Sequence, residues 1–268
     1  MNQIIGFIGC GNMAQAMIKG IISEGSYGPE DIYVSDPNSK ALSMMRENHG
    51  VVPSQNNVPV AQAADIIFLS VKPNLYKTVI DEIKDVIKPD ALVIMIAAGQ
   101  TIEANEAQFN KPVKLIRAMP NTPAMVGEGM TAICTNKHVT KEEESLVLEI
   151  FRSFGKAELI SESLFSAVIG ISGSSPAYAF MFIEALADSG VAAGLPRQQA
   201  YTFSAQALLG SAKMVLKTNK HPGELKDMVC SPGGTTIDAV AELENSGFRS
   251  SVIKAVKACV DKADLMSK

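Results

Sequence analysis

The sequence is poor in the residues on which metal and disulfide chemistry depends. It contains three histidines and four cysteines among 268 residues. The histidines are isolated and show no HExxH-type spacing, so we expect no metal site. The cysteines lie far apart and form no CxxC pair, which favours reduced thiols in a cytoplasmic protein.

Basic clusters and long apolar runs are scarce as well. The formal net charge is −4, and the lack of a Lys/Arg cluster argues against nucleic acid or an anionic membrane as a partner. A membrane span needs roughly 18 apolar residues with few or no charges, and we expect none here. The first apolar run starts directly at the N-terminus, so we expect no signal segment either.

What the sequence does contain is a glycine-rich turn near its start. The apolar residues 4–8 predict a buried strand, Gly9-Cys10-Gly11 breaks it, and residues 12–23 continue with helical spacing. Gly9 would permit a tight turn, and Gly11 would let the backbone approach a pyrophosphate on the helix N-terminus. Ala14 replaces the third glycine of the fingerprint, which the pattern allows. The stretch favours a dinucleotide-binding βαβ unit, although glycines between a strand and a helix also serve plain turn geometry.

Asp36 lies roughly where an acidic residue of such units binds the cofactor ribose. It follows a strand expected over residues 31–35 and lies about 25 residues after the glycine turn. An acidic residue there would hold the ribose hydroxyls and favour NAD, whereas Ser35, Ser39 and Lys40 could accommodate a 2′-phosphate. An Asp that simply starts a turn is an equally good interpretation, so this position leaves the cofactor open.

The rest of the first 161 residues alternates between predicted strands and helices. Strands are expected at residues 64–71, 92–97, 113–119, 131–135 and 157–160, and helices at residues 39–48 and 74–87. A further helix should begin at the capping box Thr140–Glu143 and close at Gly155. This alternation predicts an α/β Rossmann-type nucleotide-binding domain over residues 1–161.

The remaining residues, 162–268, lack strand signals. Helices are expected at residues 175–190, 196–218, 223–229, 236–246 and 250–266. The second of them is apolar and alanine-rich around much of its circumference, and about 100 residues offer little interior in which to bury it. We therefore expect an all-α domain that packs against another subunit.

The stretch Ser231-Pro232-Gly233-Gly234-Thr235-Thr236 is the polar feature of this second half. Several backbone N–H groups and two hydroxyls at a helix start suit a carboxylate or a phosphate. The alternative is a simple helix cap by Thr235 or Thr236. Composition alone leaves both interpretations open.

Other enzyme classes find less support. Residues 170–174 resemble a nucleophile elbow, but Ser174 stands where the GxSxG pattern needs glycine. A 3-hydroxyacid dehydrogenase would carry a catalytic lysine at the start of its second domain, and Ala179 occupies that position. A non-catalytic NAD(P)-binding redox sensor would leave the Ser231–Thr236 stretch without a role.

Three stretches together identify a family. They are residues 7–13 (FIGCGNM), residues 172–178 (SGSSPAY) leading into 183–185, and residues 227–236 (DMVCSPGGTT) followed by 247–249. Val71-Lys72-Pro73, Ala97-Ala98-Gly99 and residues 119–123 fit as well, so the resemblance covers essentially the whole chain. The sequence closely resembles the pyrroline-5-carboxylate reductases, which complete proline biosynthesis.

The resemblance implies roles for individual residues. The cofactor phosphates would lie on Ile8, Gly9, Cys10, Gly11, Asn12 and Met13. The adenosine end would meet Asp36 and Asn57. The nicotinamide side would meet Ser70, Val71, Lys72, Pro73, Ala97, Ala98 and Gly99. The substrate carboxylate would bind at Ser231, Gly233, Gly234 and Thr235, and the catalytic Thr236 hydroxyl would reach the ring nitrogen.

The resemblance also implies the reaction and the assembly. Hydride would pass from NAD(P)H to the C=N bond of 1-pyrroline-5-carboxylate and give L-proline. NADPH is the expected cofactor and NADH is possible, because Asp36 stands where some relatives have a residue suited to a 2′-phosphate. The helical domain would interlock with that of a partner into a homodimer, and several dimers would form a ring, a decamer.

Overall fold

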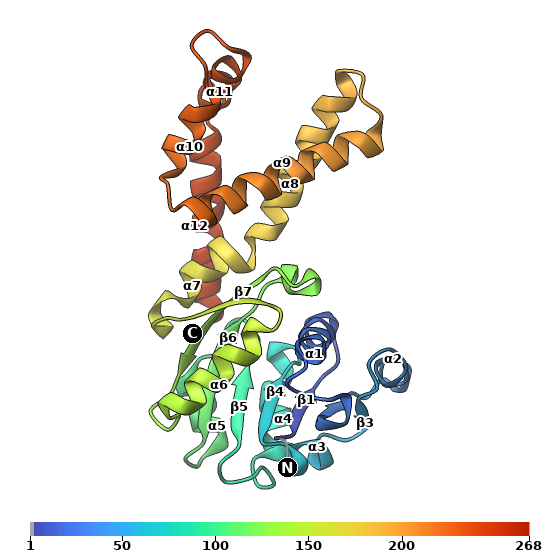
Figure 1. Ribbon diagram of the computed structural model, residues 1–268. Helices are drawn as coiled ribbons and strands as arrows, with labels where there is room; N and C mark the ends of the chain where they lie inside the picture. Colours follow the sequence, from blue (N-terminus) through green and yellow to red (C-terminus); the bar gives the residue numbers. More distant parts are fainter. Residues whose placement is uncertain (1–2, 268) are drawn as a thin grey trace. The chain divides into compact units, whose positions relative to one another are not determined.

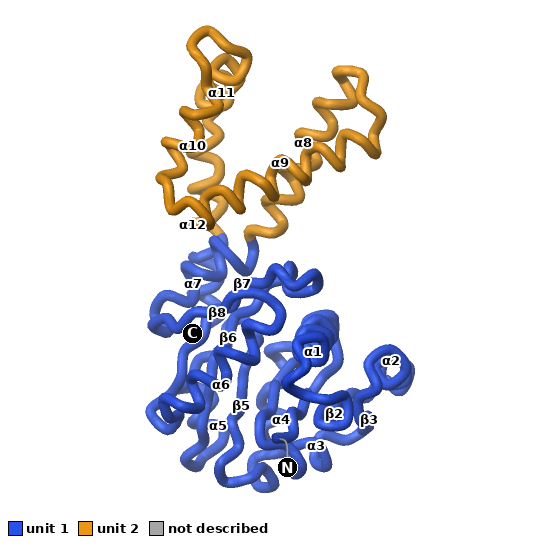
Figure 2. The backbone as a smooth tube through the Cα atoms, in the orientation of Figure 1, with its two compact units in different colours: residues 1–174, 259–268 blue, residues 175–258 orange. Residues whose placement is uncertain are grey.

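The computed structural model describes residues 3–267, which form two compact units (Figures 1 and 2). The first unit runs to Ser174 and includes the chain from Cys259 onward, and the second comprises Ser175–Ala258. Only the first unit contains strands among the described residues.

The first unit is built on an eight-stranded sheet in the order β3-β2-β1-β4-β5-β6-β7-β8. The strands are β1 (Ile5–Ile8), β2 (Ile32–Ser35), β3 (Val52–Ser54), β4 (Ile66–Leu69), β5 (Leu92–Met95), β6 (Lys114–Met119), β7 (Gly129–Thr135) and β8 (Gly155–Leu159). Strands β1 to β6 pair with one another in parallel, as the alternation predicts. The β6–β7 pair is antiparallel, which the sequence pattern did not indicate.

The pairing register places the ends of the central strands at one level. Ile8 pairs with Ser35 on one side and with Leu69 on the other, and Leu69 pairs with Met95. The segments that follow β1, β2, β4 and β5 therefore start at the same edge of the sheet. In open parallel sheets this carboxyl edge is where ligands bind.

Helices cover both faces of this sheet (Figure 1). They are α1 (Asn12–Glu24), α2 (Ser39–His49), α3 (Asn57–Ala63), α4 (Tyr76–Ile83), α5 (Ile102–Phe109), α6 (Lys141–Arg152) and α7 (Phe165–Val168). Helix α2 ends one residue beyond the predicted range of 39–48, and Gly50 ends it in a left-handed conformation with φ of 72°. Helix α5 was not predicted.

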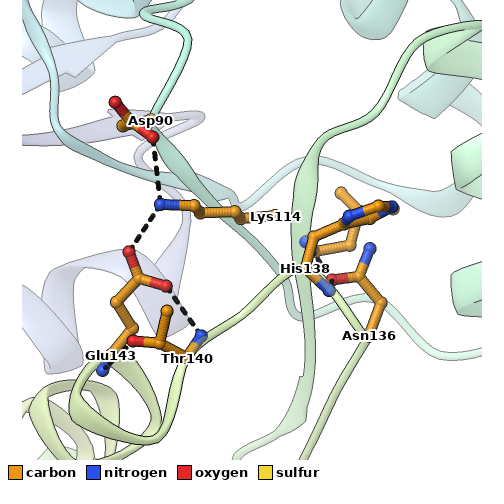
Figure 3. A network of polar contacts seen from close by, with 7 residues as sticks. Asp90, Lys114, Asn136, His138, Thr140 and Glu143 are labelled. Carbon is orange, nitrogen blue, oxygen red and sulfur yellow. Dashed lines mark hydrogen bonds and ion pairs between the residues drawn. The ribbon is translucent and has the colours of Figure 1, made fainter.

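The predicted capping box at the start of α6 is present (Figure 3). The Thr140 Oγ1 atom accepts a hydrogen bond from Glu143 N, and Glu143 Oε2 accepts one from Thr140 N. The other carboxylate oxygen of Glu143 accepts from Lys114 Nζ at 2.7 Å, and Lys114 also reaches Asp90 at 3.2 Å. These bonds fix the N-terminus of α6 to the start of β6.

The predicted end of α6 at Gly155 is wrong. The helix ends at Arg152, and Gly155 instead opens β8. A Cβ atom on Gly155 would lie 2.1 Å from the Gly129 carbonyl oxygen, so glycine is needed there for the close approach of β7 and β8. Position 155 does require glycine, but for the contact between two strands and not for the end of a helix.

Two apolar clusters lie on the two faces of the sheet. Phe7 and Phe68 belong to one cluster and their rings stack with centroids 4.6 Å apart. Ile8 and Leu69 belong to the other. Because neighbouring strand residues point to opposite faces, β1 and β4 are buried on both sides, as expected for central parallel strands.

The compact units differ from the predicted domains, 1–161 and 162–268. Phe165 and Ile169, from α7 and from a π-helix over Ile169–Gly173, pack in the second apolar cluster of the first unit, and so does Ala263. In addition, Asn121 Nδ2 donates to the Ser172 carbonyl oxygen at 3.1 Å. The first unit therefore extends past residue 161 and takes in the end of the chain.

The second unit is helical. Its helices are α8 (Ser175–Ala192), α9 (Arg197–Thr218), α10 (Pro222–Val229), α11 (Thr235–Asn245) and the first part of α12 (Phe248–Met266). Helices α8 and α9 pack on each other through small buried residues such as Ala187 and Ala200. The large exposed side chains include Phe180, Met181, Phe203, Leu216 and Ile253, each more than 60% accessible in the single chain.

One helical segment, Glu162–Ala192, is long and apolar enough by length and composition to cross a membrane. The expectation that no apolar run reaches the length of a membrane span is wrong by length and composition, since residues 163–183 carry no charged side chain. The most apolar window is only 17% buried. This segment therefore presents apolar surface that the isolated chain leaves uncovered.

Candidate active site

A cavity of about 1210 Å³ opens at the carboxyl edge of the sheet in the first unit. Its lining includes these predicted cofactor residues: Gly9, Gly11, Asn12, Met13, Asp36, Asn57, Ser70, Val71, Lys72, Pro73, Ala97 and Ala98. They come from the segments after β1, β2, β3, β4 and β5. The structure thus brings most of the predicted cofactor set to one pocket.

Three predicted cofactor residues lie outside this lining. Ile8 is the last residue of β1 and its side chain is 1% exposed in the core. Cys10 is 2% exposed, and burial together with the nearby Asp36 carboxylate raises the pKa of its thiol to about 12. Gly99 has φ of 78°, and a Cβ atom there would lie 2.8 Å from the Met266 carbonyl oxygen. These three residues are therefore close to the pocket in sequence but are not part of its lining.

The glycine turn has the geometry of a phosphate cradle. Gly9 has φ of 95°, and a Cβ atom there would lie 2.7 Å from the Ser70 carbonyl oxygen. Gly11 is the N-cap of α1 without a side-chain cap, and a Cβ atom there would meet no atom within 4 Å. The first three residues of α1 line the cavity, and their uncapped N–H groups together with the helix dipole favour an anion there.

The carboxylate of Asp36 is tied to this turn. Its Oδ2 atom accepts from Cys10 N at 3.0 Å, and its Oδ1 atom accepts from Asn38 N at 2.9 Å. Asp36 therefore orders the glycine turn while it lines the part of the pocket that follows β2. A turn role and a ribose role are compatible for the same side chain.

Asn57 is held by two neighbours. Its Oδ1 atom accepts from Ser35 Oγ at 2.8 Å, and its Nδ2 atom donates to Glu82 Oε2 at 2.7 Å. Glu82 also lines the pocket. The pocket thus presents two carboxylates, Asp36 and Glu82.

Sequence reasoning missed several lining residues. They include Gln55, Asn56, Thr78, Glu82 and Pro120. Gln55 and Asn56 follow β3 directly, so the rule that polar residues cluster after parallel strands could have found them. Thr78 and Glu82 lie one helical turn apart on α4, and nothing local distinguishes them from an ordinary solvated face.

The residues that line the pocket after β4 and β5 are mostly small or apolar, with Ser70 and Lys72 as polar exceptions. Ala97 and Ala98 leave room, and Ser70 Oγ is buried without a hydrogen-bond partner within residues 3–267. A buried hydroxyl without a partner costs free energy unless a ligand or water satisfies it. The open phosphate cradle and this hydroxyl both fit a bound dinucleotide.

The predicted substrate loop lies in the second unit. Gly233 has φ of 66°, Gly234 N donates to the Ser231 carbonyl oxygen at 3.0 Å, and α11 begins at Thr235. The N-cap is Gly234, and α11 has no side-chain cap. The simple-cap alternative is therefore wrong, and the first turn of α11 is available to an anion.

Within residues 3–267, no group of three or more His, Cys, Asp or Glu side chains could hold a metal ion. His138, one of the isolated histidines, lies in the turn before α6, where its backbone N donates to Asn136 Oδ1 (Figure 3).

Comparisons with known proteins agree with this architecture. Two family models match: NADP oxidoreductase coenzyme F420-dependent over residues 4–99, and pyrroline-5-carboxylate reductase dimerisation over residues 162–266. A pyrroline-5-carboxylate reductase of Escherichia coli (strain K12) is 51% identical over 268 residues, 100% of both chains.

Solved structures of pyrroline-5-carboxylate reductases are also similar to this chain over its whole length. A pyrroline-5-carboxylate reductase from Coxiella burnetii superimposes with a TM-score of 0.93 at 37% identity, covering 100% of both chains. The pyrroline carboxylate reductase of Plasmodium falciparum, solved with NADP bound, has a TM-score of 0.91 at 34% identity and covers 100% of this chain and 99% of that one.

The phosphate cradle, the pocket at the strand ends and the helical second unit define a dinucleotide-dependent oxidoreductase with a Rossmann-type domain. The full-length identity then fixes the family. The chain belongs to the pyrroline-5-carboxylate reductase family.

Proposed function

We propose that this protein reduces 1-pyrroline-5-carboxylate to L-proline with NAD(P)H, the last step of proline biosynthesis. The observation that carries the proposal is the full-length identity of 51% to a pyrroline-5-carboxylate reductase. The open phosphate cradle at Gly11 and the loop before α11 support it, because the reaction needs a dinucleotide and an anionic substrate.

The reaction asks little of side-chain acid–base chemistry. A cyclic imine accepts hydride readily once its nitrogen is protonated, and that iminium forms in solution. The protein must mainly bind the substrate carboxylate and orient the ring. Backbone N–H groups around Gly234 and the hydroxyls of Ser231 and Thr235 suit the carboxylate, and the Thr236 hydroxyl can contact the ring nitrogen.

The first unit would hold the cofactor, which supplies the hydride when it is bound. The N–H groups at the start of α1 would bind the pyrophosphate, and Asp36 would contact the adenosine ribose. Ser70 Oγ would satisfy its hydrogen bond on the nicotinamide half. Ala97 and Ala98 would leave space for the ring.

The family model over residues 162–266 indicates self-association. The exposed apolar side chains of α8 and α9 support a homodimer that covers them. We further propose that the dimers assemble into a ring, a decamer, and that the protein works in the cytoplasm. Reduced cysteines and the net charge of −4 are consistent with that location.

Oxidation of NAD(P)H at 340 nm with 1-pyrroline-5-carboxylate tests the activity. We expect oxidation of NAD(P)H with the imine and no reduction of NAD with 3-hydroxyisobutyrate. Turnover of the hydroxyacid instead would favour a 3-hydroxyacid dehydrogenase. Cofactor binding without turnover of any imine would favour a redox sensor.

A further inference from the structure

Tyr76, the first residue of α4, has its hydroxyl at the point where β4 and β5 end. The side chain is fully buried. Its hydroxyl donates to the Leu69 carbonyl oxygen at 2.8 Å and accepts from Ile96 N at 3.2 Å and from Ala97 N at 3.1 Å. One oxygen atom therefore joins the last residue of β4 to the first two residues after β5.

These three bonds replace sheet pairing where the strands separate. The β4–β5 register ends at the pair Leu69 and Met95. Beyond it, the backbone groups of Ile96 and Ala97 would need another partner, because buried N–H groups are costly without one. The Tyr76 hydroxyl supplies that partner and holds the two strand ends at a fixed spacing.

The segments that it joins form one end of the pocket. Ser70 to Pro73 follow Leu69 directly, and Ala97 and Ala98 follow β5; all of them line the cavity. Tyr76 itself is not among the lining residues. It therefore acts on the pocket only through the backbone that it fixes.

We propose that Tyr76 is a positioning residue that sets the geometry of the nicotinamide half of the cofactor pocket. The proposal rests on the proposed function only in assigning the nicotinamide ring to this end. The Tyr76 hydroxyl makes no hydrogen bond to the glycine turn of residues 9–11, so we expect the pyrophosphate and adenosine contacts to depend on it less than the nicotinamide contacts do. Burial also raises the pKa of Tyr76, so the hydroxyl stays protonated and able to donate throughout the working pH range.

The substitution Tyr76→Phe removes one atom and keeps the ring in place. We expect NADH to bind about tenfold more weakly, because the nicotinamide end loses its preorganised spacing, while ADP-ribose, which lacks the nicotinamide ring, binds within about twofold of the wild type. At saturating cofactor, kcat with 1-pyrroline-5-carboxylate should fall about tenfold with little change in the KM of the imine. Calorimetry gives the affinities and the 340 nm assay gives the rates.

Tyr27→Phe is the matched control. Its hydroxyl makes a 3.4 Å bond to Gln3 and lies outside the cofactor pocket, so both affinities should remain those of the wild type. Equal losses for NADH and ADP-ribose in Tyr76→Phe would show a general structural role and overturn the proposal, and so would no loss for either. A wild-type protein that binds NADH but reduces no imine would refute the proposed function and leave this comparison intact.

Hydrogen exchange on the wild type decides the case if the circular dichroism spectrum shows that Tyr76→Phe does not fold. NADH should slow exchange at the Ile96 and Ala97 amides about tenfold more than ADP-ribose does, because the ring orders the segments that Tyr76 joins. Equal protection by the two ligands would overturn the proposal.

Discussion

We propose that Asp36 sets the charge next to the adenosine ribose of a bound cofactor. Its carboxylate lines the pocket together with that of Glu82, and the cation among the lining residues, Lys72, follows β4 and not β2. A carboxylate can accept hydrogen bonds from ribose hydroxyls but repels a 2′-phosphate. Asp36 should therefore limit the use of NADPH relative to NADH.

The substitution Asp36→Asn tests this discrimination. It removes the charge and keeps an oxygen that can accept from Cys10 N. We expect the ratio of kcat/KM for NADPH to that for NADH to rise about tenfold, a change of about 1.4 kcal/mol in relative transition-state binding. Steady-state kinetics with both cofactors measure the ratio. An unchanged ratio would mean that Asp36 serves only the turn.

Thr236 is the residue that we assign to the ring nitrogen of the substrate. Thr236→Ala should lower kcat about 10²-fold while the affinity for the cofactor changes little, because the hydroxyl would act on the reacting imine. Thr236→Ser, which keeps the hydroxyl, should recover most of the rate. Equal losses of turnover and cofactor affinity in the Ala variant would contradict this role.

At the scale of elements, Arg117 and Glu162 connect β6 to the segment that leads into α7. Arg117 is 3% exposed, and its Nη1 atom donates to Glu162 Oε1 at 2.9 Å. The same oxygen accepts from Ile102 N at the start of α5, and the guanidinium lies 4.4 Å from the centroid of the Phe165 ring. Arg117 Nε and Nη2 have no hydrogen-bond partner in the part of the chain that the structure describes. The positive charge of the guanidinium is therefore balanced by the Glu162 carboxylate.

Glu162→Ala should therefore destabilise the first unit by about 3 kcal/mol, because it leaves a buried guanidinium uncompensated. Arg117→Met, which fills the volume without charge, should cost less than Glu162→Ala even though it breaks the same ion pair. Urea unfolding gives both free energies. A larger loss for Arg117→Met would show that the guanidinium contributes more through packing than it costs through burial.

The sequence predicted the elements whose signals are local. The apolar run at residues 64–71 and the Thr140–Glu143 capping box each carry their pattern within a few residues, and both are present. The antiparallel pairing of β7 and the π-helix at Ile169–Gly173 depend on distant contacts such as Asn121 with Ser172. Those contacts have no signature in a local window.

The pocket residues also divide into those with a local sequence signal and those without one. The glycine turn and Asp36 were found because their spacing follows from the βα unit itself. Tyr76 and Glu82 lie on α4, and its apolar spacing predicts only which face is buried. A hydroxyl that joins two strand ends can be recognised only when the strands are seen side by side.

At the scale of the whole molecule, the second unit leaves its helices uncovered. Phe203 is 66% exposed and Met181 is 69% exposed, and monomeric proteins rarely expose large contiguous apolar surface. We therefore predict that sedimentation analysis at micromolar concentration gives a mass of at least twice 28.5 kDa. A concentration-independent mass of one chain would contradict the predicted interface.

Isotope transfer shows whether the protein passes hydride from the nicotinamide ring to a cyclic imine. NADH or NADPH that carries deuterium at the transferable C4 position would be incubated with the protein and 1-pyrroline-5-carboxylate, and the product analysed by mass spectrometry and NMR. We expect L-proline with one deuterium on the ring carbon that lies next to nitrogen and bears no carboxylate. Unlabelled proline, or no proline from protein that binds the cofactor, would contradict this expectation.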